Sequence, residues 1–193
     1  CLMIHRHYEG VAKALKRSDR KHEVKVTWDD SLSLPITDPA ARTAIFLVGG
    51  SRGLGMHALQ WAMKNFAGQF VNYVFVSVGE VDKQSFDSER SIVSLQTRID
   101  NSLNYFTSYC ASRGLPSASY RAFGADPLEE LEHLMTAEVL KNHPNNVSFA
   151  SKLVFRNENL ATRQLHNHMP LAMQRKLSLI GHELIVVPVE VEE

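Results

Sequence analysis

The sequence predicts a Rossmann-like α/β domain with a doubly wound, five-stranded parallel sheet that is covered by helices on both faces. Unbroken apolar runs indicate strands buried on both sides, because a half-exposed strand would alternate apolar and polar residues. Stretches with helical periodicity separate these runs, which gives the order β-α-β-α-β-α-β-α-β from Thr43 onward. Right-handed crossovers then make the sheet parallel and doubly wound.

Four strands are expected at unbroken apolar runs, and a weaker run at 118–123 lies between two helical segments. The four runs are Thr43–Val48, Tyr73–Val78, Val147–Phe155 and Leu184–Val189. Phe75 and Val154 are expected to point into the covered sheet, where a carboxylate introduced by substitution would be buried without a partner.

The expected helices carry apolar residues at steps of three and four, which places these residues along one face. One such helix covers about 89–112 and ends at Gly114. A second opens at Asp126, an N-cap residue that is followed by Pro127 in the first turn, and the stretch 142–146 closes it.

A third helical stretch is expected at 157–180, where Pro170 should kink or divide the helix. Before the first strand stands an amphipathic helix at about 5–16, followed by a polar linker with a short strand at 24–28. Two parts of the chain are therefore expected. Residues 1–40 hold the first helix and the linker, and residues 41–193 form the α/β domain.

The composition excludes several classes of protein. The 21 basic residues balance the 21 acidic residues, so no overall field would attract nucleic acid, and no nucleic-acid partner is expected. The two cysteines provide neither a disulfide framework nor metal-ligand spacing, which suits a reducing compartment. No run of about 18 apolar residues is present, so no part of this sequence is expected to span a bilayer.

A glycine-rich string directly follows the first expected strand and opens a helix. It reads GGSRGLG at 49–55, and the spacing of Gly49, Gly53 and Gly55 resembles the cofactor loop of short-chain dehydrogenases. Glycines at such a turn let a pyrophosphate approach the amides of a helix N-terminus. They also let the helix pack closely on the sheet. We favour this packing role over cofactor binding.

The remainder of the sequence argues against a dehydrogenase. That family uses a tyrosine with a lysine four residues later, whose ammonium group lowers the pKa of the phenol. None of the five tyrosines has a lysine at that spacing. We therefore expect no catalytic residue and no cofactor. An NAD(P)-dependent oxidoreductase and a nucleotide-sensing domain, both using Gly49, Gly53 and Gly55, remain as alternatives.

Other candidate sites have less support. His5 with His7 and His166 with His168 stand two apart, so on a helix they do not face each other, and no metal site is expected. Glu80 and Asp82 follow the second strand, where a Rossmann protein would hold a ribose, but solvated acids are commoner than ligands at such positions.

Several phrases, dispersed along nearly the whole chain, carry a resemblance to a known family. They are HRHYEGVAKAL at 5–15, FVSVGEVD at 75–82, KLVF at 152–155, LHN at 165–167 and QRKL at 174–177. Together these phrases resemble the soluble C-terminal domain of bacterial amino-acid permeases, which belong to the amino acid–polyamine–organocation superfamily.

The resemblance implies a fold like that of universal stress proteins. It also implies a non-catalytic regulatory or assembly role on a membrane transporter for amino acids or related solutes or cations. The expected partner is the transmembrane part of the same transporter, at the cytoplasmic face of the bacterial inner membrane, and a homodimer is left open. ATP binding is not implied, because 156–163 lacks the glycines of the phosphate loop of ATP-binding stress proteins. A free-standing α/β binding protein is a further alternative.

The start of the chain supports a juxtamembrane position for the first helix. The first 25 residues hold seven Lys or Arg against three acids, and the chain begins at Cys1 without a start methionine, as a piece of a longer polypeptide would. Arg6, Lys13, Lys16 and Arg17 are expected to bind an anionic membrane surface weakly. Alternatively, this helix packs on the sheet and its charges are solvated.

Overall fold

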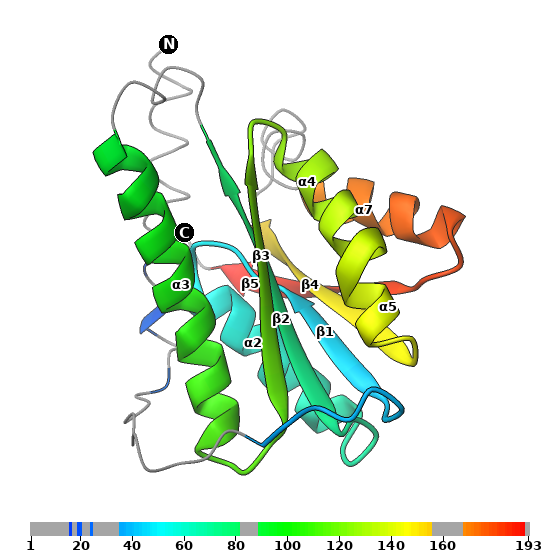
Figure 1. Cartoon of the computed structure of the whole chain (residues 1–193). Coiled ribbons are helices and arrows are strands. Elements are labelled where there is room, and N and C mark those ends of the chain that lie inside the picture. Colours follow the sequence, from blue (N-terminus) through cyan, green and yellow to red (C-terminus); the bar gives the residue numbers. More distant parts are fainter. Residues whose placement is uncertain are drawn as a thin grey trace.

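The five expected strands form one all-parallel sheet in the order β3-β2-β1-β4-β5 (Figure 1). The computed structural model describes residues 16, 19–20, 24, 35–81, 89–155 and 168–191. The strands are β1 (Thr43–Leu47), β2 (Asn72–Glu80), β3 (Ser117–Gly124), β4 (Asn146–Phe155) and β5 (Leu184–Val191). The Rossmann-like fold predicted from the sequence is confirmed, including the strand at the weak apolar run.

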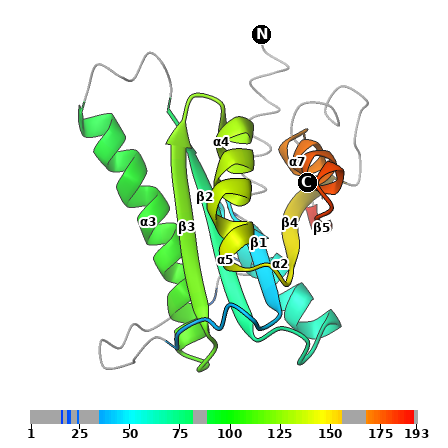
Figure 2. The same ribbon diagram turned by 45° about the vertical axis from the view of Figure 1, so that its right-hand side comes forward.

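Helices cover both faces of this sheet, as Figures 1 and 2 show. The described helices are α2 (Arg52–Asn65), α3 (Glu89–Ala111), α4 (Pro127–Leu134), the π-helical turn η2 (Met135–Val139), α5 (Leu140–Asn142) and α7 (His168–Leu179). On one face α2 packs on β1, β4 and β5, and α3 packs on β2 and β3. On the other face α4 packs on β2 and β3, and α7 packs on β4 and β5.

Aromatic side chains form the centre of the core under α2 and α3. Phe46 of β1 lies in register with Phe75 of β2 and with Phe149 of β4. Their rings stack at centroid distances of 5.6 Å and 5.2 Å, and Phe106 of α3 stacks on Phe75 at 5.1 Å. Ile45, the neighbour of Phe46, is fully buried in the cluster on the opposite face. Both faces of β1 are therefore apolar, which explains its unbroken apolar sequence.

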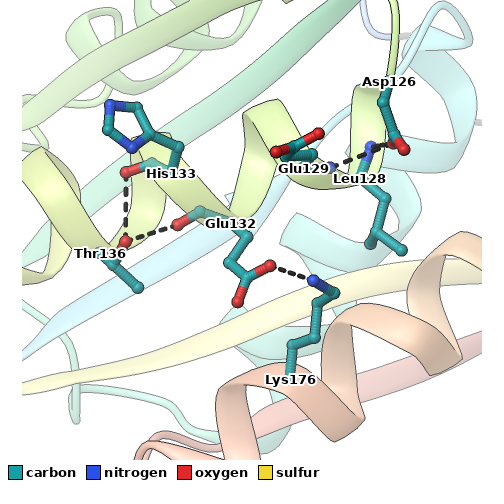
Figure 3. Close-up of polar contacts among 7 residues, drawn as sticks. All are labelled: Asp126, Leu128, Glu129, Glu132, His133, Thr136 and Lys176. Atoms are coloured by element: carbon teal, nitrogen blue, oxygen red, sulfur yellow. Dashed lines mark hydrogen bonds and ion pairs between the residues drawn. The ribbon is translucent and has the colours of Figure 1, made fainter.

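Helices α4 and α7 lie side by side and are joined by a charged contact, shown in Figure 3. Asp126 caps α4 as predicted, because its Oδ1 accepts hydrogen bonds from the N–H groups of Leu128 and Glu129, at 3.0 Å and 3.2 Å. Glu132 of α4 forms an ion pair with Lys176 of α7. The two helices thus cover their face of the sheet as one layer.

Of two sequence-based expectations about single residues, the one for Val154 needs correction. Pro170 lies in the first turn of α7, which begins at His168. A proline there removes no helical hydrogen bond, and the part of the predicted helix that precedes it, 157–167, lies outside the described residues. Val154, near the end of β4, is only half-buried, whereas Phe75 is fully buried. Most of the predicted helix at 5–16, the strand at 24–28 and the stretch 157–167 lie outside the described residues.

Candidate functional site

The candidate site lies at the carboxyl edge of the sheet, where the strand order reverses. Strands β2 and β3 lie on one side of β1, and β4 and β5 lie on the other side. In open α/β sheets, ligands bind outside the carboxyl ends of the strands at such a switch point. The glycine string at 49–55 connects β1 to α2 there.

Two cavities meet at the backbone of Gly49 and Gly50, which line both of them. The apolar cavity has a volume of about 590 Å³ and lies between the glycine string, α4 and α7. Most of its walls are aliphatic or thioether side chains, including Leu47, Val76, Val78, Leu131, Met169 and Met173. The polar crevice has a volume of about 810 Å³ and lies between the ends of β1 and β2 and helix α3.

The glycines of the string differ in what surrounds them. A Cβ on Gly49 or Gly50 would have nothing within 4 Å, so the backbone there borders open space. Gly55 is buried, and a Cβ on it would stand 2.5 Å from Cζ of Phe106 on α3. Close packing, the role favoured from the sequence, therefore accounts for Gly55 but not for Gly49.

Asp19, from the N-terminal segment, occupies the beginning of α2. Its Oδ1 accepts hydrogen bonds from the N–H of Gly53 and from the hydroxyl of Ser51, each at 2.7 Å. Ser51 is the N-cap residue of α2, and its Oγ accepts a hydrogen bond from the N–H of Leu54 at 3.3 Å. Side chains of the chain itself therefore satisfy the first-turn donors at Gly53 and Leu54.

The carboxylate of Asp19 therefore occupies the N-terminal end of α2, which is the end that can bind an anion. The N-terminus of a helix carries a partial positive charge and free N–H groups, so it favours an anion. In nucleotide-binding proteins a phosphate takes that place. A nucleotide phosphate here would have to displace Asp19 or lie beside its negative charge.

Further contacts fix Val24 and the glycine string against α3. The hydroxyl of Tyr105 donates to the carbonyl of Val24 at 3.1 Å and accepts from the N–H of Val24 at 2.8 Å. The guanidinium of Arg52 lies 5.0 Å from the centroid of the Tyr105 ring and donates to the carbonyl of Asn101 at 3.2 Å. Arg52, the cation of the string, therefore faces α3 and lines neither cavity.

Burial lowers the reactivity of three described groups, Cys110, Tyr73 and His143. It raises the pKa of the Cys110 thiol to about 12 and also raises the pKa of the Tyr73 hydroxyl. The thiolate is the reactive form of cysteine, so Cys110 is inert while it is buried. Burial lowers the pKa of His143, which precedes β4 at the opposite edge of the sheet from the glycine string.

The described part of the chain offers no group of three His, Cys, Asp or Glu side chains that could hold a metal ion. Within the same residues, no helix combines the length and apolarity needed to cross a membrane. Of the predicted membrane-proximal residues, Lys16 is exposed and lines the apolar cavity. Arg6, Lys13 and Arg17 lie outside the described residues.

Comparisons with known proteins assign no family to this chain. No protein-family model matches it, and no curated protein matches it. The resemblance to the permease domain therefore stays a prediction from the sequence phrases.

Proposed function

We propose that this chain is a non-catalytic regulatory or assembly domain on the cytoplasmic side of a bacterial membrane transporter for amino acids or related solutes or cations. The phrases at 5–15, 75–82, 152–155, 165–167 and 174–177 support this function, because they resemble the C-terminal domain of amino-acid permeases. The closer likeness to universal stress proteins is part of the same proposal, and the strand order is compatible with it.

The position of Asp19 on the end of α2 carries the proposal. A dehydrogenase or a nucleotide sensor would use that end of the helix for phosphate. In this chain it holds the segment that precedes the sheet, through two hydrogen bonds of 2.7 Å. The glycine string then attaches the N-terminal segment to the α/β domain. Such an attachment suits a domain that is one part of a longer protein.

This attachment would couple the orientation of the α/β domain to the orientation of the part of the protein that precedes it. The link is reinforced at Asn72 of β2, whose Nδ2 donates to the carbonyl of Asp38 at 2.7 Å and whose Oδ1 accepts from the N–H of Asp38 at 3.1 Å. The proposed partner is therefore the transmembrane part of the same transporter. Arg6, Lys13, Lys16 and Arg17 would orient the domain at an anionic surface, and a homodimer is compatible with this role.

A nicotinamide-dependent oxidoreductase or a nucleotide sensor is the second candidate. The open space beside Gly49 and Gly50 favours it, because a ligand could approach the backbone there. It has less support than the regulatory role, because Asp19 holds the helix end and no tyrosine has a lysine four residues later.

The coding sequence immediately upstream of Cys1 tests the proposed function. We expect it to encode about ten to twelve hydrophobic spans, each of about 20 residues, in one reading frame with this chain. A start codon directly before Cys1, or an upstream enzyme domain without membrane spans, would contradict the transporter role.

A further inference from the structure

The polar crevice combines three features that the proposed function does not use. The first is the open backbone at Gly49 and Gly50, where a Cβ would meet no atom within 4 Å. The others are a buried hydroxyl on Ser102 and two charged side chains, those of Glu80 and Arg98, all of which line the crevice. Each of these side chains lacks a partner among the described residues.

Ser102 differs from other hydroxyl residues of α3. Thr97, Thr107 and Ser108 each donate a hydrogen bond to a carbonyl one turn earlier in the helix, which is the usual arrangement for a helical serine or threonine. Ser102 is only 6% exposed, and its Oγ has no hydrogen-bond partner in the structure. A buried polar atom without a partner is uncommon in proteins, and here it lies in the wall of a crevice large enough for a ligand.

Glu80 and Arg98 bring opposite charges to the same crevice from two different elements. Glu80 ends β2, and Arg98 comes from the middle of α3. The described residues form ion pairs elsewhere, between Arg121 and Asp100 and between Lys176 and Glu132, and these leave Glu80 and Arg98 unpaired. Both side chains are exposed, so an incoming ligand can reach them.

We propose that the polar crevice binds a small zwitterion that carries one carboxylate and one ammonium group, of which the free α-amino acids are the simplest class. The guanidinium of Arg98 matches a carboxylate with two parallel hydrogen bonds, and Glu80 accepts hydrogen bonds from an ammonium group. The hydroxyl of Ser102 supplies one further hydrogen bond from the buried wall. This site goes beyond the proposed function and does not rest on it.

The test uses the whole chain, labelled with ¹⁵N, and the standard L-amino acids titrated one at a time. Propionate and ethylamine, which each carry one of the two charged groups of alanine, are titrated as matched probes. We expect at least one amino acid to shift the amide resonances of Gly49, Gly50 and Ser102 to saturation. Propionate and ethylamine should bind at least about tenfold more weakly, because each leaves one charge of the crevice unpaired.

Variants assign the contacts. Arg98→Gln and Glu80→Gln should each weaken amino-acid binding about tenfold or more, and Ser102→Ala about fivefold. Lys141→Gln, on the opposite face of the sheet, is the control and should bind like the parent. Arg98→Lys keeps the charge but loses the paired geometry, so it should retain part of the affinity. Thermal melts confirm that each variant is folded.

Several outcomes would overturn the zwitterion site. They are no saturable shift with any amino acid, propionate or ethylamine binding as tightly as the amino acid that binds best, or amino-acid binding that Arg98→Gln and Glu80→Gln leave unchanged. None of them bears on whether membrane spans precede Cys1, so failure here is distinguishable from failure of the transporter role.

Discussion

Asp19 joins the N-terminal segment to the start of α2 through one carboxylate oxygen. Asp19→Ala removes both hydrogen bonds and the negative charge at the helix N-terminus. We expect it to lower the free energy of unfolding by about 1–2 kcal/mol, because hydrogen bonds to a charged group are worth more than neutral ones but this residue is only half-buried. Urea denaturation measures the loss, and hydrogen exchange should become faster at the Gly53 amide.

Glu138→Ala is the matched control, since Glu138 is an exposed carboxylate far from the glycine string. It should change the free energy of unfolding by less than about 0.5 kcal/mol and leave exchange at Gly53 as in the parent. Equal stability and equal Gly53 exchange in Asp19→Ala and the parent would show that Asp19 does not hold this end of the helix.

His143 makes the stability of the domain depend on pH. The residue is 2% exposed, its Nε2 lies 3.1 Å from the hydroxyl of Tyr120, and burial lowers its pKa below the ordinary 6.5. Between the lowered pKa and 6.5 the unfolded chain therefore binds more protons than the folded chain. The contribution of His143 to the free energy of unfolding is complete above pH 6.5 and is lost as the pH falls through this window.

We expect His143→Gln to flatten the pH dependence of the free energy of unfolding below pH 6.5, measured by urea denaturation. The exposed His133→Gln should leave that pH dependence as in the parent. If His143→Gln and the parent lost stability at the same rate as the pH falls, His143 would not be the group responsible.

At the scale of single residues, the sequence predicted some residues of the candidate site and missed others. The glycine string was visible because its residues are contiguous. Asp19 was not, because it lies 34 positions before Gly53 and no motif links the two. Ser102 resembles any other serine in a helix, and only the structure shows that its hydroxyl is buried without a partner.

At the scale of elements, the packing of α2 against α3 depends on the missing side chain of Gly55. Gly55→Ala would place a Cβ 2.5 Å from the Phe106 ring. We expect the strain to lower the free energy of unfolding by about 1–3 kcal/mol, measured by urea denaturation.

Gly49→Ala is the comparison, because its Cβ would meet no atom within 4 Å. It should change stability by less than about 0.5 kcal/mol. The glycine string would need a different explanation if Gly49→Ala destabilised the domain as much as Gly55→Ala.

The element pattern was largely predictable because both faces of the sheet are covered. Continuous apolar runs identified β1, β2, β4 and β5, and a run with fewer apolar residues still identified β3, an edge strand. Burial at the ends of strands was less predictable. Val154 continues the apolar run of β4 but is only half-buried.

At the scale of the whole molecule, two helical layers enclose a sheet whose switch point borders two cavities of different chemistry. The sequence predicted where a ligand would approach this fold, because the glycine string follows β1. It did not predict that the chain fills the helix end with its own Asp19. Asp19 and Val24 therefore contact the α/β domain directly, although both precede its first strand in the sequence.

The central claim is that the N-terminal end of α2 binds the Asp19 carboxylate and not the phosphates of a cofactor. Calorimetric titration of NADH and of NADPH into the whole chain tests this claim most directly. We expect no measurable binding of either nucleotide, because the Asp19 carboxylate occupies the helix end that would otherwise attract their phosphates. Saturable binding in the micromolar range, with hydride transfer to any carbonyl compound, would contradict it and would favour an oxidoreductase that uses Gly49, Gly53 and Gly55.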